Sequence, residues 1–372
     1  MSKISAQISD SLFRLALSAL NERPDESAVV SPFSIAMAMA AANLGAKENT
    51  TKEITDVLFS GIPKNQITAW FRERLIALKD DYSPLSIASA IYLEKTLDLL
   101  DRYQIDLAQN FDSSVEKVDF SNDSRTQVAV INGYVEKATN GKIKELFSGQ
   151  SITPLTRVVL VNALYLNARF DSKFDKQMTH EDIFNNEDGS TKEVPNMNGT
   201  KNGQFFENED FAYAEIPFKN GGFSFFLIVP KTGRLSDLKE QFSSGNHSIS
   251  STDSGSEYIP YIHMTLPKFK AEASFDLAYT LQKLGVVDFF TPGAANLSGI
   301  TGAALNADAV VHKAVFELHE EGVEAAAATG ISIMLLSATI EESTEERFIK
   351  ADRPFLYGVA YKGAPLFLGQ FY

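Results

Sequence analysis

The chain has 372 residues, of which 44% are hydrophobic and 22% are charged, a composition typical of globular proteins and not of disordered or coiled-coil chains. The formal net charge of −14 argues against nucleic acid or anionic membranes as partners, because an acidic surface repels phosphate groups. Cysteine is absent, which excludes disulfides, thiolate nucleophiles, zinc–thiolate sites and iron–sulfur clusters.

The first predicted element is an amphipathic helix. Its apolar residues recur at intervals of three and four positions: Ile4, Ile8, Leu12, Leu15 and Ala19. A charged residue interrupts the apolar stretch and no small-residue cleavage site follows, so a packed helix is favoured over a secretion signal. No run reaches the roughly 18 apolar residues of a membrane span. We therefore expect a cytoplasmic protein, with secretion still open if the start is an engineered mature N-terminus.

Helices dominate the predicted elements of the first 150 residues and strands those that follow. Helical patterns cover residues 35–44, 70–79, 99–110 and 128–139. Strand patterns cover residues 157–170, 223–230, 262–270, 354–361 and 364–372. This order, without regular alternation of strand and helix, predicts an α+β fold.

The segment 243–256 is polar and of low complexity. It has the composition of a linker between two domains and equally of a surface loop within one domain. We favour the loop, because the strands predicted on either side are expected to belong to shared sheets. No internal repeat is present.

Enzyme chemistry is not visible in the sequence. The motifs G-x-S-x-G and H-E-x-x-H and the phosphate-binding Walker loop are all missing. His312 and His319 lie near three glutamates, but on a strand these two histidines point to opposite faces, which disfavours a metal site. We expect His312 to be a buried, hydrogen-bonded histidine, and we expect no metal, no cofactor and no catalytic residue.

The segment 320–340 has an unusual alternation. One set of alternate positions is uncharged throughout: Val323, Ala325, Ala327, Thr329, Ile331 and Ile333. This is the period of a β-strand with one apolar face, and such a segment would slide between existing strands at little desolvation cost. An acidic stretch follows at 341–346. The pattern fits an exposed recognition loop and a buried strand with an acidic linker equally well.

The chain resembles a serpin along essentially its whole length. The similarity rests on sequence blocks that occur in family order. They are Val30-Ser31-Pro32-Phe33-Ser34-Ile35, Thr139-Asn140-Gly141-Lys142-Ile143, Val161-Asn162-Ala163-Leu164-Tyr165, Leu266-Pro267-Lys268-Phe269, Asn296-Leu297-Ser298-Gly299, the hinge at 320–329, Asp352-Arg353-Pro354-Phe355 and Pro365-Leu366-Phe367-Leu368-Gly369. The resemblance, to inhibitory members and to the intracellular, ovalbumin-like branch, implies one domain over residues 1–372. It also implies about nine helices, three β-sheets and a reactive-centre loop at about 320–346.

The function that this resemblance implies is suicide inhibition of a protease. The protease cleaves the loop as bait and forms an acyl-enzyme, and the freed loop inserts into the central sheet as a new strand, which distorts and traps the enzyme. The implied hinge comprises Glu320, Glu321, Gly322, Val323, Glu324, Ala325, Ala326, Ala327, Ala328 and Thr329. Val323 stands where Thr or Ser is usual, but it is uncharged and β-branched, so we expect insertion to survive.

By the family's spacing, the reactive bond lies between Leu336 and Ser337, flanked by Met334 and Leu335. A leucine before the bond suits chymotrypsin-like or elastase-like proteases, which have a large apolar primary pocket. Leu335 also suits papain-like cysteine proteases, so cross-class inhibition is an alternative, as is a non-inhibitory chaperone or carrier. The stretch from the bond to Pro354 is longer than expected, so cleavage at Met334, Leu335 or Ile340 stays open.

The resemblance also implies roles for further individual residues. The polar cluster where the central sheet must part is matched by Ser31, Ser34, Asn162 and His312. Phe170 stands where a tryptophan is usual, which keeps the apolar contact and loses the indole donor. The basic residues Lys64, Arg72, Arg74 and Lys79 are scattered among acidic ones, so we expect no activation by heparin. The expected partner is a covalently bound target protease, and the expected state is a monomer that binds neither nucleic acid nor membranes.

Overall fold

The computed structural model describes residues 2–79, 83–148, 152–323 and 345–372. Within them lie nine α-helices and two hydrogen-bonded β-sheets, together with two short 3-10 helices at Lys176–Met178 and Asp288–Phe290. The helices are α1 (Lys3–Leu20), α2 (Pro32–Gly45), α3 (Glu48–Phe59), α4 (Lys64–Leu78), α5 (Asp101–Phe111), α6 (Phe120–Ala138), α7 (Leu235–Ser244), α8 (Ile249–Gly255) and α9 (Leu277–Leu284). The predicted α+β class is confirmed.

The strands are more numerous than the sequence patterns predicted. They are β1 (Ala28–Val30), β2 (Leu85–Glu94), β3 (Ser114–Val118), β4 (Val158–Leu166), β5 (Ala168–Arg169), β6 (His180–Asn185), β7 (Thr191–Glu207), β8 (Phe211–Pro217), β9 (Phe223–Pro230), β10 (Glu257–Pro267), β11 (Phe269–Asp276), β12 (Ala309–His319), β13 (Gly322–Val323), β14 (Glu346–Lys350), β15 (Phe355–Tyr361) and β16 (Ala364–Phe371). Three of them interrupt the first 150 residues, which are otherwise helical as expected.

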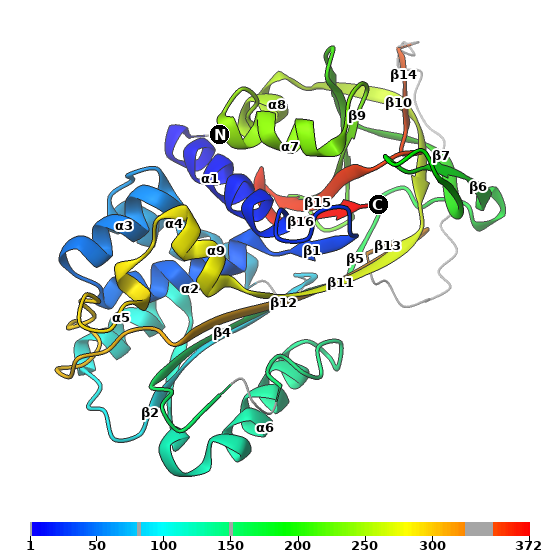
Figure 1. Cartoon of the computed structure of the whole chain (residues 1–372). Coiled ribbons are helices and arrows are strands. Elements are labelled where there is room, and N and C mark those ends of the chain that lie inside the picture. Colours follow the sequence, from blue (N-terminus) through cyan, green and yellow to red (C-terminus); the bar gives the residue numbers. More distant parts are fainter. Residues whose placement is uncertain (1, 80–82, 149–151, 324–344) are drawn as a thin grey trace.

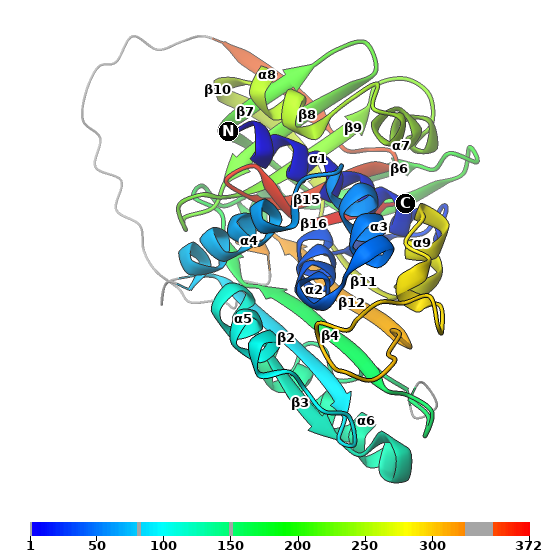
Figure 2. The same cartoon turned by 90° about the vertical axis from the view of Figure 1, so that its left-hand side faces the viewer.

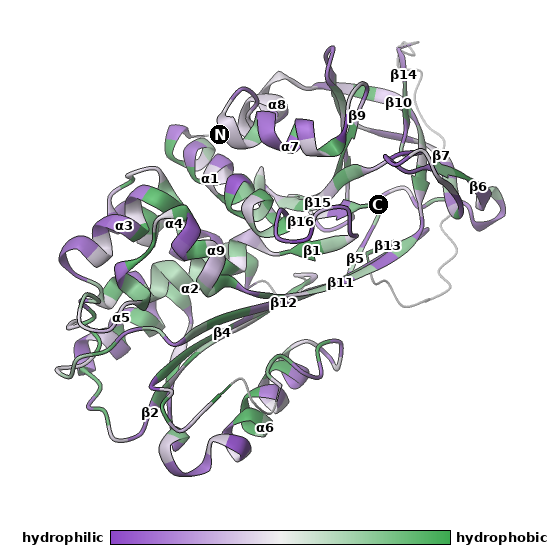
Figure 3. Ribbon diagram, in the orientation of Figure 1, coloured by the Kyte–Doolittle hydropathy of each residue, from purple (hydrophilic) through white to green (hydrophobic). Residues whose placement is uncertain are grey.

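Helices α1 and α2 show how the core forms. Helix α1 begins where Ser2 accepts a hydrogen bond from the Ser5 backbone N–H, and its apolar stripe is buried from Ile8 onward, whereas Ile4 is only partly buried. Helix α2 begins at Ser31 and Pro32, and nearly all of its side chains are buried, so it runs through the interior. Figure 3 shows the contrast, because α2 is green or pale along its length whereas α3 and α7 carry purple stretches.

The seven-stranded sheet has the order β3-β2-β4-β12-β13-β5, with β11 paired to β12. Figure 1 shows α6 on one side of this sheet and α2, α9 and the nine-stranded sheet on the other. The view in Figure 2 looks onto the strands and shows β4 running beside β2 and β12 through the middle of the sheet. This sheet carries the candidate functional site.

The nine-stranded sheet has the order β1-β16-β15-β9-β8-β7-β10-β14, with β6 paired to β7. The third sheet expected from the family is present as one end of it, formed by β6, the first half of β7, β10 and β14. The two parts are joined because β7 continues through Thr191–Glu207, pairing first with β6 and later with β8.

The predicted loop at 243–256 is wrong. This segment contains the end of α7 and the whole of α8, which begins where Ser248 accepts a hydrogen bond from the Ser251 backbone N–H. Ile249 is buried, and Ser250 donates to Asp10 of α1 at 2.7 Å. The polar composition therefore reflects a short helix held by capping and by distant partners, and not an open loop. Among the described residues, no helix is long and apolar enough to cross a membrane.

Candidate functional site

Strands β4 and β12 of the seven-stranded sheet are joined over only part of their length. Their parallel ladder runs from Ala309 and Val159 to His312 and Asn162, and in the described chain it stops there. At the other end of β12, the short strand β13 lies between β12 and β5, paired to both. Since β5 follows β4 after one residue, the sheet is closed at the His312 end and again at the hinge end, with an unpaired stretch between them.

Gly322 and Val323 form strand β13, at the start of the predicted loop. Gly322 has a φ of +144°, and a Cβ placed on it would overlap the Ala168 carbonyl oxygen, so only glycine fits this position. Val323 is 1% exposed and lies between Leu318 of β12 and Ala168 of β5. The first inserting residue expected from the family is thus already buried within the sheet.

Glu320 fixes the turn that leads into β13. Its carboxylate lies 3.2 Å from Lys268 Nζ and accepts a hydrogen bond from Thr179 Oγ1 at 3.0 Å, and its side chain is only 4% exposed. Burial alone would raise the pKa of Glu320, but the hydrogen bonds from its own backbone, Lys268 and Thr179 outweigh burial and hold the pKa below its usual range. The carboxylate is therefore charged at neutral pH and depends on Lys268 for compensation.

Glu321 is bound more loosely. It pairs with Lys176 at 3.2 Å, and this hydrogen bond lowers the pKa of the Glu321 carboxyl. The backbone carbonyls of Glu320 and Glu321 accept hydrogen bonds from the N–H groups of Phe174 and Phe170, at 2.8 and 2.9 Å. The turn at the start of the hinge is therefore attached to the segment after β5 through both backbone and side chains.

Phe170 lies at the centre of an aromatic cluster below this turn. It is 1% exposed and stacks on Phe218 with ring centroids 5.2 Å apart. The rings of Phe174 and Phe225 pack against it in T-shaped arrangements, with centroid distances of 5.7 and 6.0 Å. The apolar contact expected of phenylalanine at this position is present, and no indole donor is needed because the ring is surrounded by other rings.

His312, Ser31 and Ser34 meet at the closed end of the ladder. The Ser31 backbone N–H donates to His312 Nε2 at 3.0 Å, and Ser34 Oγ lies 3.5 Å from Nδ1. Complete burial lowers the pKa of His312 to about 3, so the ring is neutral and its Nε2 is the acceptor. His312 is the buried, hydrogen-bonded histidine that the sequence predicted.

Asn162, the fourth member of the predicted polar cluster, behaves differently. It lies directly opposite His312 in the ladder and is 4% exposed. Its side-chain Oδ1 and Nδ2 are buried without a hydrogen-bond partner among the described residues. The structure therefore joins three members of the cluster by hydrogen bonds and leaves the fourth beside them with its amide unsatisfied.

The segment after α6 covers the unpaired stretch. Lys313 of β12 donates to the Glu145 carbonyl oxygen at 3.2 Å and pairs with Glu272 at 2.9 Å. Asn132 of α6 accepts from the N–H groups of Leu146 and Phe147, and Phe147 belongs to an apolar cluster with residues of β2, β4 and β12. A strand that enters the sheet here has to displace these contacts.

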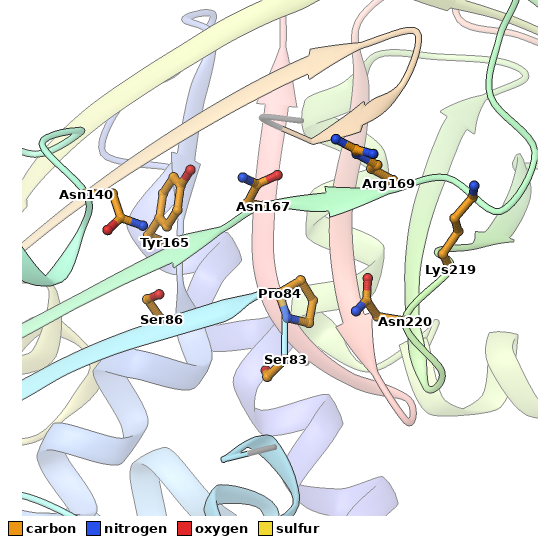
Figure 4. Close-up of a pocket in the computed structure, with 9 residues that line it drawn as sticks. All are labelled: Ser83, Pro84, Ser86, Asn140, Tyr165, Asn167, Arg169, Lys219 and Asn220. Carbon is orange, nitrogen blue, oxygen red and sulfur yellow. The ribbon is translucent and has the colours of Figure 1, made fainter. Parts of the chain in front are cut away.

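A polar pocket of about 410 Å³ lies where the end of β4, the start of β2 and the residues just after α6 come together. Figure 4 shows its lining, in which Arg169 comes from β5, opposite Gly322 in the ladder. The lining residues are Ser83, Pro84, Ser86, Asn140, Tyr165, Asn167, Arg169, Lys219 and Asn220. The pocket is thus next to the hinge and, through Tyr165 of β4, also borders the unpaired stretch.

Several predicted site residues lie outside the described residues: Glu324, Ala325, Ala326, Ala327, Ala328, Thr329, Met334, Leu335, Leu336 and Ser337. In contrast, Lys268 and Thr179, which hold Glu320, were not predicted as site residues. Lys268 stands in one of the sequence blocks that carry the family resemblance, which is the signal that points to it. Thr179 offers no comparable signal.

Comparisons with known proteins agree with this architecture. The family model described as "Serpin (serine protease inhibitor)" matches residues 7–372. Human Serpin B4 is 34% identical over an alignment of 364 residues, which covers 92% of this chain and 92% of that chain. The structure of Serpin48 from the insect Tenebrio molitor has a TM-score of 0.85, 28% identity, and coverage of 99% of this chain and 97% of that chain. Thyroxine-binding globulin in complex with thyroxine has a TM-score of 0.84, 26% identity, and coverage of 99% and 98%.

The matches cover both sheets, the hinge and the polar cluster. A family model that spans nearly the whole chain, and a relative more than 30% identical over nine-tenths of both chains, are sufficient for assignment. The chain therefore belongs to the serpin family, whose members are mostly protease inhibitors and not enzymes.

Proposed function

We propose that this serpin is a suicide-substrate inhibitor of serine proteases with apolar primary specificity, of the chymotrypsin-like or elastase-like type. The observation that carries the proposal is strand β13, where Val323 is buried between β12 and β5, next to a stretch of β4 and β12 that is not paired within the described residues. A loop that continued from Val323 would complete the sheet by pairing with both strands. Backbone pairing along a whole strand is a source of free energy for distorting a bound protease.

In the proposed reaction, the hydroxyl oxygen of the protease serine attacks the Leu336 carbonyl carbon. The Leu336–Ser337 bond breaks, the serine proton passes through the protease histidine to the leaving amine, and Ser337 becomes a new N-terminus. The Leu336 carbonyl is left as an ester on the protease. Insertion of residues 323–336 then distorts the protease before water hydrolyses this ester.

We further propose that the protein acts as a monomeric, single-domain inhibitor without metal, cofactor or heparin. Two of the basic residues of α4 are used inside the fold, which supports the heparin proposal. Lys64 donates to the carbonyls of Leu44 and Ala46, and burial lowers its pKa to about 8. Arg74 stacks on Trp70 at 3.6 Å. The absence of nucleic acid and membrane partners and the cytoplasmic location stay predictions.

The direct test is incubation with chymotrypsin, followed by electrophoresis after boiling in SDS. We expect a covalent complex of inhibitor and protease, together with the peptide that begins at Ser337. Mass spectrometry of that peptide identifies the reactive bond and distinguishes it from cleavage after Met334, Leu335 or Ile340. Cleaved inhibitor with full protease activity at every molar ratio would contradict the proposal.

Thyroxine-binding globulin supports a second candidate, a non-inhibitory carrier or chaperone, because its structure shows that this fold also binds a small ligand. The two candidates differ after the loop is cut. An inserting serpin becomes markedly more resistant to heat, whereas a carrier that does not insert its loop keeps its melting temperature. A covalent adduct with a papain-like protease and none with chymotrypsin would favour the cross-class alternative.

A further inference from the structure

Exposed aromatic side chains gather on the outer face of β10 and β14. Phe348 is 70% exposed, Tyr258 60% and Tyr261 37%. On β14, Phe348 points outward while its neighbour Ile349 is buried, as the alternation of a strand requires. Tyr261 lies opposite Glu346 and His263 lies opposite Phe348, so Tyr261, His263 and Phe348 share one face. We call Tyr258, Tyr261, His263 and Phe348 the β10–β14 face.

Neighbouring side chains hold these rings in place. Phe348 stacks on His263 with centroids 4.7 Å apart and an interplanar angle of 18°. The other side of His263 is fixed by Thr200 Oγ1, 3.1 Å from Nδ1, and Asn202 donates to the Tyr258 hydroxyl at 3.1 Å. Rings that are fixed before a partner arrives lose little conformational entropy on binding, and this is how aromatic hot spots are built in protein interfaces.

The position of the face relative to the bait determines which partner can reach it. The chain leaves the described residues after Val323 and returns at Glu345, one residue before β14 begins. Fully extended, the stretch from Ser337 to Glu346 spans at most roughly 30 Å. A single-domain protease of about 220 residues has a radius of gyration of roughly 17 Å. A protease bound at the bait is therefore held within reach of this face, and its body is wide enough to contact it.

We propose that the β10–β14 face is a secondary docking site for the body of the target protease while the bait occupies its active site. The partner is a protease whose surface beside the cleft carries an apolar patch bordered by a cation, which matches the aromatic rings and Glu346, whose carboxylate also lies 3.4 Å from His263 Nε2. Contact at this face adds binding energy before the bond is cut and so raises the rate of complex formation. It leaves the later competition between insertion and hydrolysis unchanged.

This inference rests on the proposed inhibitory function, and the face also has a competing use. Within the described residues β14 is an edge strand, and such an edge can pair with a strand from a second copy of the chain. The experiment therefore includes the oligomeric state as an outcome. It also includes a binding measurement that does not depend on trapping.

The variants are Tyr261→Ser/Phe348→Ser, which removes two rings of the face, and Tyr258→Ser, which leaves β14 untouched. Tyr279→Ser is the matched control, because Tyr279 on α9 is 62% exposed and lies outside the face. We expect the double variant to form the covalent complex with chymotrypsin at least tenfold more slowly and Tyr258→Ser several-fold more slowly. The number of inhibitor molecules consumed per protease and the melting temperature should match the control.

A rate for the double variant equal to that of Tyr279→Ser would overturn the docking site. A lower rate accompanied by a rise in inhibitor molecules consumed per protease would also overturn it, because that result would show that the face takes part in loop insertion and not in docking. Dimers of the unaltered chain that dissociate in the double variant, with no change in rate, would assign the face to a second copy.

The separate measurement uses chymotrypsin that is blocked by replacing its catalytic serine with alanine, which leaves the active site open to the bait. Binding of this enzyme to the unaltered chain, weakened at least tenfold in the double variant, supports the face even if active chymotrypsin is never trapped. In that case the proposed inhibitory function fails and the docking surface stands. If active chymotrypsin is trapped at an unchanged rate and the blocked enzyme does not bind, the inhibitory function stands and the docking surface fails.

Discussion

The two ends of the unpaired stretch between β4 and β12 are closed by different chemistry. At the His312 end, a neutral ring in a fully buried site accepts a hydrogen bond from the Ser31 backbone. At the hinge end, the charged carboxylate of Glu320 is held by Lys268 and Thr179. The first closure is fixed by burial and the second by an ion pair.

The difference indicates how the sheet is expected to open. A neutral hydrogen bond in a buried site depends little on salt, whereas an ion pair weakens with screening or when either partner is lost. The hinge end, where insertion starts in the proposed mechanism, is therefore the end that a change of charge disturbs most. The His312 end resists such changes until the pH falls far enough to protonate the ring.

The largest expected effect is that of Val323→Arg, at the hinge end. A guanidinium at a position 1% exposed between two strands has no partner there, and an unpaired buried charge costs several kcal/mol, roughly. We expect the variant to be cleaved as a substrate and to form almost no covalent complex with protease. Val323→Ala is the control, because it keeps an uncharged side chain. Full trapping by Val323→Arg would disprove insertion in this protein.

Glu320→Lys should be the next most severe change. It places a second ammonium beside Lys268 and should lower the free energy of unfolding by about 1.5 to 3 kcal/mol, less than for a fully buried pair because Lys268 is 46% exposed. Glu321→Lys is the matched control, since its pair with Lys176 is more exposed and should contribute about 1 kcal/mol or less. Chemical denaturation measures both. Equal losses for the two variants would remove the distinction between the buried and the exposed pair.

His312→Phe tests the opposite end. It leaves the Ser31 N–H without an acceptor, at a cost of about 1 to 3 kcal/mol at neutral pH. Because the pKa of His312 is lowered to about 3, the unfolded chain binds a proton there that the native chain does not, between about pH 6.5 and 3. The unaltered protein should therefore lose stability as the pH falls through this window.

The pH dependence itself supplies the control for that prediction. Denaturation curves recorded at several pH values should be flatter in acid for His312→Phe than for the unaltered chain. His180→Phe, at an exposed histidine, is the control for removing an imidazole. An identical acid slope in all three proteins would show that His312 does not govern it. Glu320 also contributes in acid, because its lowered pKa makes its stabilisation disappear below the usual glutamate range.

Lys313→Met should have the smallest effect. Lys313 tethers β12 to the segment after α6 through Glu145 and pairs with Glu272, whose side chain is half exposed. We expect a loss of at most about 1 kcal/mol in the free energy of unfolding. In the proposed mechanism the loop enters beside β12, where Lys313 makes this contact, so loop insertion after cleavage should become faster in the variant. The rate of insertion is measured as the rise in melting temperature with time after cleavage. A slower rise in the variant would show that the contact of Lys313 with Glu145 assists insertion.

Much of this site can be predicted from the sequence, because it depends on patterns among neighbouring residues. The alternation that starts at Val323 and the requirement for glycine at 322 are properties of neighbouring residues. The pair of Lys268 and Glu320 joins residues 52 positions apart, so no periodicity predicts it. Helix α8 escapes prediction for the same reason, since Ser250 depends on Asp10, 240 positions away. The family resemblance predicts the polar cluster, but the missing hydrogen bonds of Asn162 depend on exact side-chain geometry.

Asn162 has a consequence for protein engineering. A buried amide without partners costs about 1 to 3 kcal/mol, so Asn162→Leu should make the protein harder to unfold. A search for heat-resistant variants would therefore select this substitution early. If the inserted state gives the amide its partners, the same substitution removes part of the difference in free energy that drives inhibition. Selection for shelf life and selection for protease inhibition would then favour opposite residues at this position.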